Sequence, residues 1–237
     1  MRILVHICCA PCFAYPHHKL REEHEVIGFW YNPNIHPYME YKARMEAVKK
    51  YAMLEEVEVI YEEYDFIDYL KMQLQNVERP ARCINCYRYR LEKTARYAKQ
   101  HGFDAFTTTM LVSHHQYHEE IKKVGEEMEK KYGIKFFYED FRPGWKEGKA
   151  ITKAYSLYTQ KYCGCLVSEW ERFGGKRSSY FKTLPVSIYH RYKSSSASVT
   201  PAILAIFVSN FSISSYFLFV KLFGFSISLC LQSKSSI

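Results

Sequence analysis

The chain has 237 residues and a mass of 28.2 kDa, enough for one large domain or two small ones with a sizeable core. Apolar residues make up 48% and charged residues 24%, which excludes a wholly disordered chain and a multi-span membrane protein. The formal net charge is +8, but no acidic residue follows Glu171, and the basic residues of 172–237 account for the whole excess. The charge therefore says little about what the folded part binds.

Short β-like runs alternate with longer amphipathic stretches through the first 171 residues. In chain order, we predict strands over 2–7, 26–31, 57–61, 103–112 and 136–138, and helices over 12–23, 38–53, 65–75, 86–100 and 113–131. Pro37 suits a first helical position, and Ser113 with Gln116 matches a capping box that opens the last of these helices.

This alternation predicts βαβ units, because parallel strands need long crossover connections. The predicted fold is therefore α/β, with a Rossmann-like parallel sheet that carries helices on both faces. In such sheets ligands bind at the carboxyl ends of the strands. The first strand runs directly into Cys8 and Cys9, so these residues are expected at that edge.

The segment after residue 173 differs from the rest in composition. Residues 186–237 are dominated by Ser and large apolar residues, and 202–220 carries no charge over a length close to a bilayer span. We predict a domain of residues 1–173 and a Ser-rich apolar tail of 174–237. The tail is interpreted as a poorly ordered or non-native extension, a C-terminal membrane anchor or a packed part of the core. The N-terminus lacks a signal-peptide pattern, which favours a cytoplasmic protein.

Seven of the eight cysteines fall into three tight groups, namely Cys8, Cys9 and Cys12, then Cys83 and Cys86, then Cys163 and Cys165. Clustered cysteines in a cytosolic chain indicate metal ligation or redox chemistry. The residues Cys8, Cys9, Cys83 and Cys86 could supply four thiolates to zinc or to an iron–sulfur cluster. Adjacent cysteines are awkward in a zinc knuckle, so the spacing favours the cluster. Buried, unreactive cysteines are the remaining alternative.

The Cys163-Gly164-Cys165 sequence is a different kind of motif. Two thiols so close can join only in a tight ring, and the intervening glycine allows the backbone angles that closure needs. A constrained bond of this kind exchanges readily, which favours a redox-active pair. Ligation of a second metal, together with Cys12, is the alternative. Cys230 lies alone in the tail and needs no role.

One segment is rich in positive charge. Residues 79–99 contain one acid, Glu92, and seven basic residues: Arg79, Arg82, Arg88, Arg90, Lys93, Arg96 and Lys99. Since the segment also carries two of the clustered cysteines, it is interpreted as a surface that faces nucleic acid, with Tyr87 and Tyr89 able to stack on an unstacked base. A solvated helix face is the alternative.

Several motifs occur in order from Arg2 to about Phe173: His6-Ile7-Cys8-Cys9-Ala10-Pro11-Cys12, Asn32-Pro33-Asn34-Ile35 with Arg44, Arg82-Cys83-Ile84-Asn85-Cys86-Tyr87 with Arg90, and Tyr162-Cys163-Gly164-Cys165 with Ser168. Together they resemble the QueH family of epoxyqueuosine reductases. His114 and Thr159 depart from the family pattern, which tends to have proline and arginine there. Nothing in the family leads us to expect residues 174–237.

The resemblance implies an oxidoreductase that converts epoxyqueuosine to queuosine at the wobble position of tRNA, on a fold similar to the nucleotide-hydrolase-like group. It implies that Cys8, Cys9, Cys83 and Cys86 hold a [4Fe-4S] cluster and that Cys163 and Cys165 form a redox-active disulfide pair. An additional iron near Cys12 is an open alternative. The implied partners are tRNA carrying epoxyqueuosine and an unidentified electron donor, with a membrane involved only if the tail is an anchor.

Removing an epoxide oxygen consumes two electrons and two protons and releases water. His115 and Tyr162 are candidate proton donors by residue type, although His115 also suits the opening of a helix. The competing functions are an iron–sulfur electron carrier and a zinc-stabilised nucleic-acid-binding module without catalysis. An ATP-using tRNA-modifying enzyme is disfavoured, because cysteines replace a glycine-rich phosphate loop after the first strand.

Overall fold

The computed structural model describes residues 1–174. It contains a five-stranded sheet made of β1 (Arg2–His6), β2 (Glu25–Trp30), β3 (Val59–Tyr61), β4 (Ala105–Thr108) and β5 (Lys135–Phe136). The strand order is β3-β2-β1-β4-β5, and every neighbouring pair is parallel. The predicted α/β fold with a parallel, Rossmann-like sheet is therefore confirmed.

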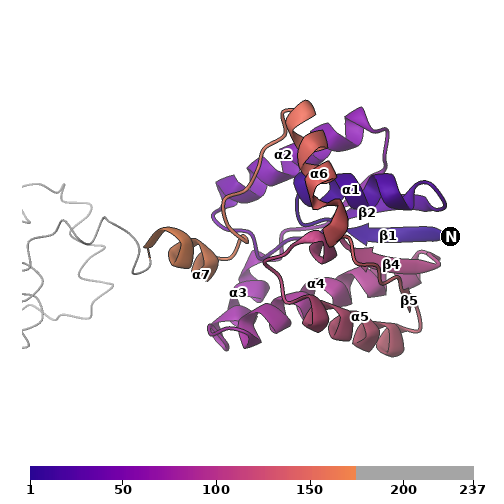
Figure 1. The fold of residues 1–237 in the computed structure, drawn as a ribbon. Coiled ribbons are helices and arrows are strands. Elements are labelled where there is room, and N and C mark those ends of the chain that lie inside the picture. Colours follow the sequence, from indigo (N-terminus) through magenta and orange to yellow (C-terminus); the bar gives the residue numbers. More distant parts are fainter. Residues whose placement is uncertain (175–237) are drawn as a thin grey trace, which may run out of the picture. The chain divides into compact units, whose positions relative to one another are not determined.

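The helices of the described chain are α1 (Ala10–Leu20), α2 (Tyr38–Leu54), α3 (Phe66–Leu74), α4 (Ala81–Gln100), α5 (His118–Tyr132), α6 (Trp145–Ala154) and α7 (Leu166–Glu169). Helices α1, α2 and α6 pack together on one side of the sheet, and α4 and α5 cover the other (Figure 1). This arrangement places helices on both faces, as predicted. It follows from right-handed crossovers, which leave one face for α1 and α2 and the other for the connections beyond β3.

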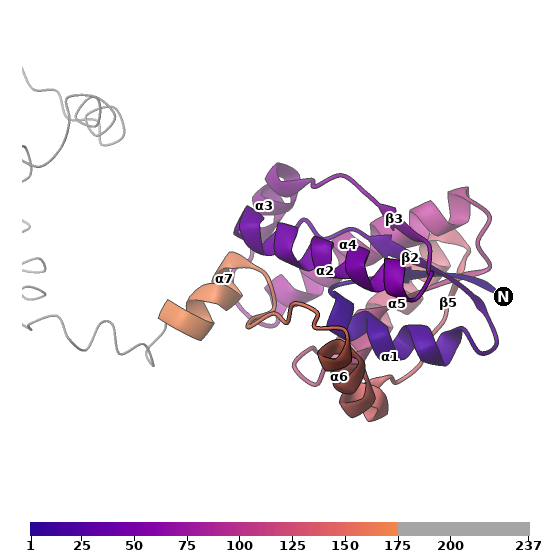
Figure 2. The same ribbon diagram turned by 90° about the horizontal axis from the view of Figure 1, so that it is seen from above.

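The centre of the sheet is buried on both faces. Ile3, Leu4 and Val5 of β1 are all fully buried. A continuous apolar run of this kind is typical of a central parallel strand, because helices cover both of its sides. In Figures 1 and 2, β1 runs from the N-terminus toward the side of the molecule where α7 lies. The carboxyl edge of the sheet therefore faces the segment that leads into α7.

Several predicted boundaries were wrong, for local reasons. Helix α4 begins at Ala81, five residues before the predicted start, so it includes Cys83 as well as Cys86. The predicted capping box does not open α5: Ser113 ends a 3-10 turn (Thr109–Val112), and α5 starts at His118. The predicted strand 103–112 divides into β4 and that turn.

The remaining differences concern ends and omissions. Pro37 occupies the N-cap of α2 instead of its first helical position. Helices α6 and α7 were not predicted. Our interpretations of the tail concern residues that lie outside the described part of the chain. Within residues 1–174, no helix is both long enough and apolar enough to cross a bilayer.

Candidate functional site

The site begins where the two central strands end. After β1 the chain leaves toward α1, and after β4 it leaves in the opposite sense, so the edge between these strands is a topological switch point. Cys8 and Thr109 follow the two strands and contact each other. The backbone N–H of Cys8 donates to Thr109 Oγ1 at 3.1 Å, and this hydroxyl donates to Cys8 Sγ at 3.3 Å. The first cysteine group therefore lies in the crevice where such folds bind ligands.

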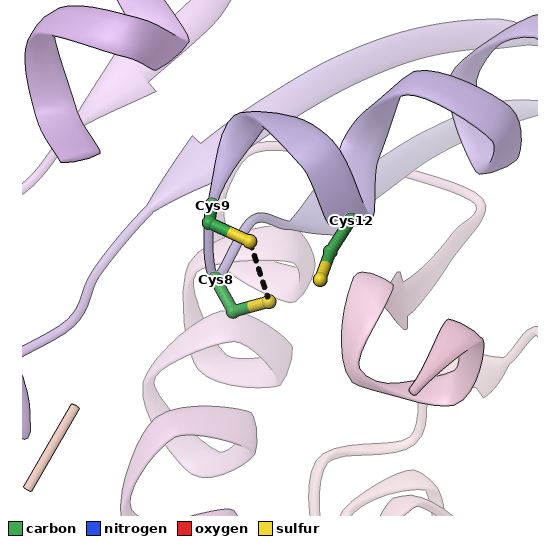
Figure 3. A group of neighbouring side chains, drawn as sticks. All are labelled: Cys8, Cys9 and Cys12. Carbon is green, nitrogen blue, oxygen red and sulfur yellow. Dashed lines mark hydrogen bonds between the residues drawn. The ribbon is translucent and has the colours of Figure 1, made fainter. Parts of the chain in front are cut away.

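Cys8, Cys9 and Cys12 form the cysteine trio. Their sulfur atoms all lie within 4.8 Å of one another, and Figure 3 shows the three side chains pointing toward a common point at the start of α1. The turn brings them together because Cys9 is the N-cap of α1 and Cys12 lies in its first turn. Three thiols at this separation could bind a metal ion.

The trio is electrostatically asymmetric. Hydrogen bonds from the Cys12 and Cys9 thiols, and from the Thr109 hydroxyl, lower the pKa of Cys8 well below its ordinary value. Burial raises the pKa of Cys9, and the hydrogen bond that Cys12 gives to Cys8 raises the pKa of Cys12. Cys8 is therefore ready to be a thiolate, the form that binds metals. Gln160 Nε2 lies 2.9 Å from Cys9 Sγ and donates to it.

The second cysteine group lies on the first turns of α4. Cys83, Cys86 and Arg90 are spaced by three and four residues, which places them on one face of the helix. Cys86 is buried and Cys83 is half-buried. Burial raises the pKa of Cys86 and raises that of Cys83 to about 11. A bound cation would be needed to keep both as thiolates at neutral pH.

The third group lies on residues 157–165, called the dithiol loop below. Three hydrogen bonds to backbone carbonyls of this loop hold it against α2 and the segment that precedes α2. Arg44 donates to the carbonyl oxygens of Tyr162 and Cys163, both at 3.0 Å, and the N–H of His36 donates to the Gly164 carbonyl at 2.7 Å. Gly164 has a φ of 133°, which side-chain-bearing residues rarely adopt. Glycine is therefore required between the two cysteines.

A small pocket that is partly open to solvent lies between α4 and the dithiol loop, and it is called the cavity from here on. Cys83, Cys86, Cys163 and Cys165 all line it, together with Arg90. The four cysteines are free thiols, as are the three of the trio. The structure therefore brings the second and third cysteine groups together around one space.

Arg90 connects this cavity to the cysteine trio. Its guanidinium donates to Asn32 Oδ1 at 3.4 Å, and the Asn32 amide donates to the carbonyl of Ile7, the residue before Cys8, at 2.7 Å. Burial lowers the pKa of Arg90, but the negative charge available on Cys86, Cys163 and Cys8 raises it above its ordinary value. One guanidinium is thus close enough to interact with a cysteine of each group.

The two predicted proton donors have different positions. His115 is exposed at the start of the segment before α5. The hydroxyl of Tyr162 donates to the carbonyl oxygen of His36, so it holds the dithiol loop. Burial raises the pKa of Tyr162, which makes the hydroxyl a weaker acid. The geometry gives Tyr162 a positioning role.

The basic segment 79–99 does not present a row of unpaired charges. Arg79 and Arg82 both pair with Glu171, Arg88 pairs with Glu127, and Lys93 pairs with Glu62. Lys99 donates to the Gly133 carbonyl, and Arg90 points into the site. Internal partners therefore account for most of the charge that the sequence assigned to a nucleic-acid surface. Tyr87 is also internal, since its hydroxyl donates to Gln116 Oε1 at 2.8 Å.

Sequence reasoning missed four polar contributors to the site: Asn32, Thr109, Gln116 and Gln160. Asn32 and Gln116 appeared only as parts of longer motifs. Gln116 Nε2 lies 3.4 Å from Cys163 Sγ, and the same amide oxygen accepts from Tyr87. The helical spacing of Cys83, Cys86 and Arg90 was the one available signal for an arginine inside the site.

A second group of metal-type donors, His17, His18 and Glu55, lies near the ends of α1 and α2. Its carboxylate already has partners. Arg21 Nη1 lies 2.7 Å from Glu55 Oε2, and the Tyr155 hydroxyl donates to Oε1 at 2.6 Å. The Arg21 guanidinium would repel a bound cation. We therefore interpret this group as a set of polar contacts that joins α1, α2 and the end of α6.

Comparisons with known proteins identify the family that this chain matches. A model of the family described as epoxyqueuosine reductase QueH matches residues 3–171. A relative named epoxyqueuosine reductase QueH from Dehalococcoides mccartyi is 40% identical over 179 residues, covering 75% of this chain and 97% of the relative. A relative of the same name from Thermotoga maritima is 37% identical over 178 residues, covering 72% of this chain and 91% of the relative.

Among solved structures, a protein described as a predicted subunit of a tRNA methyltransferase from Methanocaldococcus jannaschii superposes with a TM-score of 0.46 at 11% identity. The superposition covers 65% of this chain and 74% of that one, and it is too weak to add to the fold description. The family model, by contrast, matches residues 3–171, a range that contains all three cysteine groups. The chain therefore belongs to the epoxyqueuosine reductase QueH family.

Proposed function

We propose that this chain is an epoxyqueuosine reductase that acts on the wobble nucleoside of tRNA. The reaction removes the epoxide oxygen as water, consumes two electrons and two protons, and leaves the alkene of queuosine. The observation that carries the proposal is the presence, in a chain of this family, of a cysteine trio at the switch point of the sheet and of four further cysteines around one cavity. Electron transfer to a bound substrate at this edge is chemistry that thiolate-held metals supply.

The donor set fits a [4Fe-4S] cluster held by Cys8, Cys9, Cys83 and Cys86. Thiolates are the ligands that such clusters prefer, and the positive charge of Arg90 interacts with Cys8 and Cys86, one cysteine of each pair. When bound, the cluster would supply electrons one at a time. Cys12 lies within reach of Cys8 and Cys9, so it would be the additional ligand if a further iron binds there.

The dithiol loop would provide the second store of electrons. Oxidation of Cys163 and Cys165 to a disulfide releases two electrons and two protons, which matches the stoichiometry of the reaction. Both thiols line the cavity, and Cys163 is exposed, so substrate and an external reductant could reach this side. The clamp made by Arg44 and His36 would keep the loop at the cavity through each oxidation and reduction.

The substrate would enter from the side of Cys163. Gln116, which contacts Cys163 Sγ, is a candidate for orienting the epoxide, because its amide N–H can donate to oxygen. The physiological electron donor would regenerate the dithiol from the same side. We place the enzyme in the cytoplasm, where tRNA is modified.

The electron-carrier and zinc-module alternatives have less support. A carrier needs no second thiol pair beside its cluster, and a zinc module explains neither the cavity nor the cationic Arg90 within it. Neither alternative accounts for a family match across residues 3–171.

The decisive experiment incubates the anaerobically reconstituted full chain with a reductant and tRNA that carries epoxyqueuosine, followed by digestion and mass spectrometry of the nucleosides. We expect the loss of one oxygen mass. Cys163→Ser should retain the chromophore but lose multiple turnover, whereas Cys230→Ser, in the tail, should behave as the parent. An intact epoxide after incubation with fully loaded protein would refute the proposed activity.

A further inference from the structure

Arg90 is one of three arginines that are almost completely buried in residues 1–174, and it differs from the other two in its partners. Arg44, Arg82 and Arg90 are 2%, 3% and 2% exposed. Arg44 pairs with Glu40 at 2.7 Å, and Arg82 pairs with Glu171 at 2.6 Å. None of the ion pairs in this part of the chain includes Arg90.

The acceptors that Arg90 does have are neutral. Its Nε donates to the Cys86 carbonyl and its Nη1 to Asn32 Oδ1, both at 3.4 Å, and Nη2 lies 2.7 Å from Met110 Sδ. Two of these contacts are long, and a thioether sulfur is a weak acceptor. The remainder of the chain offers no other side-chain carboxylate, because no Asp or Glu follows Glu171.

Burying a cation without a neighbouring anion raises the free energy of the folded state, because the cation loses its hydration and gains no ion pair in return. Four cysteines line the same cavity as Arg90 among neutral polar and aromatic side chains and Arg82, and two of these cysteines, Cys83 and Cys86, lie on its own helix. Thiolates bound to iron are anionic, and their charge is spread over the cluster. An anionic group in the space beside Arg90 would therefore explain why this cation is buried there.

We propose that Arg90 is the counter-charge of the thiolate-bound cluster and that it favours the reduced form of this cluster. Adding one electron adds one negative charge beside a fixed positive one, so the guanidinium stabilises the reduced state more than the oxidised state. Nearby charge is one of the factors that set the potentials of such clusters. This inference rests on the proposed cluster and assigns to Arg90 a tuning role in its reduction.

The test is a redox titration, followed by electron paramagnetic resonance, of reconstituted full-length protein. Arg90→Gln keeps a hydrogen-bonding side chain but removes the charge, and we expect at least a tenfold loss in the equilibrium constant for reduction, a negative shift of about 59 mV for one electron. Arg90→Lys keeps the charge and should remain closer to the parent. Arg88→Gln, an exposed position on the same helix, should leave the potential unchanged.

An unchanged potential in a fully loaded Arg90→Gln protein would overturn the proposal, as would Arg90→Lys behaving like Arg90→Gln. If Arg90→Gln binds no iron, retention of iron by Arg90→Lys supports the counter-charge role, and loss in both variants overturns it.

A second measurement separates this inference from the proposed function. In metal-free full-length protein, Arg90→Met should lower the free energy of unfolding by less than Arg44→Met does, because Arg90 has no carboxylate partner whereas Arg44 pairs with Glu40. A merely structural Arg90 would make Arg90→Met at least as unstable as Arg44→Met, and that result would overturn the inference. If the parent protein itself acquires no cluster, the proposed cofactor fails, whereas the metal-free result still tests the uncompensated charge.

Discussion

Arg44 holds the dithiol loop in place, so we expect Arg44→Met to destabilise the protein. The Arg44 side chain is 2% exposed and its Nε lies 2.7 Å from the carboxylate of Glu40, which is 11% exposed. The same guanidinium donates to the carbonyl oxygens of Tyr162 and Cys163. Methionine would preserve most of the side-chain volume while removing the charge and all three hydrogen bonds.

The magnitude follows from what the variant leaves behind. Breaking a buried ion pair by removing one partner costs about 3–5 kcal/mol, because the other charge stays buried. Glu40 keeps one partner, the hydroxyl of Tyr158 at 2.5 Å, which reduces the penalty. We therefore expect Arg44→Met to lower the free energy of unfolding by about 3 kcal/mol. The released loop should also make Cys163 and Cys165 react faster with an alkylating agent.

The assay is denaturant unfolding of the full chain, with the alkylation rate of the two thiols measured in parallel. Lys49→Met is the matched control, because Lys49 pairs with Glu46 on the surface of the same helix and both side chains are about half exposed. Such a pair contributes under about 1 kcal/mol. The double variant Glu40→Gln with Arg44→Met should regain part of the loss. If Arg44→Met costs no more than Lys49→Met, the clamp does not stabilise the loop and our reasoning is wrong.

Three further predictions concern other parts of the molecule. Gly164→Ala should destabilise the protein by about 1–3 kcal/mol in the same assay, because the φ of 133° is unfavourable and the new Cβ would lie 3.2 Å from Ile35; a neutral effect would contradict this. Burial raises the pKa of Glu55, but hydrogen bonds from Tyr155 and His18 outweigh it and lower the pKa to about 2 from an ordinary 4.5. The stability that this carboxylate contributes is therefore present above pH 4.5 and is lost as the pH falls toward 2. Glu55→Gln should have a free energy of unfolding about 1–2 kcal/mol below that of the parent at pH 7. This difference in the free energy of unfolding should shrink as the pH falls toward 2, and a difference that stays constant would contradict the prediction. A chain that ends after Arg177, the limit of the first compact unit, should unfold at the same midpoint temperature as the full chain in calorimetry, and a clear decrease would show that the tail contributes to the fold.

The sequence was informative about features that depend on local pattern. The alternation of β-like and helical stretches predicted the parallel sheet, because the periodicity of apolar side chains that distinguishes strands from helices can be recognised within a short stretch of sequence. The first two cysteine groups could be predicted because their members are also close in the sequence. Cys9 and Cys12 meet within one helical turn, and Cys83 and Cys86 share one helix face, so neither encounter needs a distant part of the chain.

Helix ends were less predictable, since two local signals can compete for one segment. Ser113 matches a capping box, yet its hydroxyl accepts from the N–H of His115 and the residue ends a 3-10 turn. The helix begins four residues later than its supposed cap position would require. The preceding residues, Leu111 and Val112, are buried in the core and hold the chain in the 3-10 turn. Their burial depends on distant parts of the chain and cannot be read from the local sequence.

Only the tertiary structure decided whether each charged side chain is exposed or buried, and which partner it has. Arg88 and Arg90 lie two residues apart on α4, yet one pairs with Glu127 on the surface and the other is buried beside the cysteines. Arg44 meets the dithiol loop across more than a hundred residues of sequence. Local propensity can place a residue on a helix, but the sign and distance of its neighbours depend on which strands pair and in what order, and that order sets the electrostatics of the site.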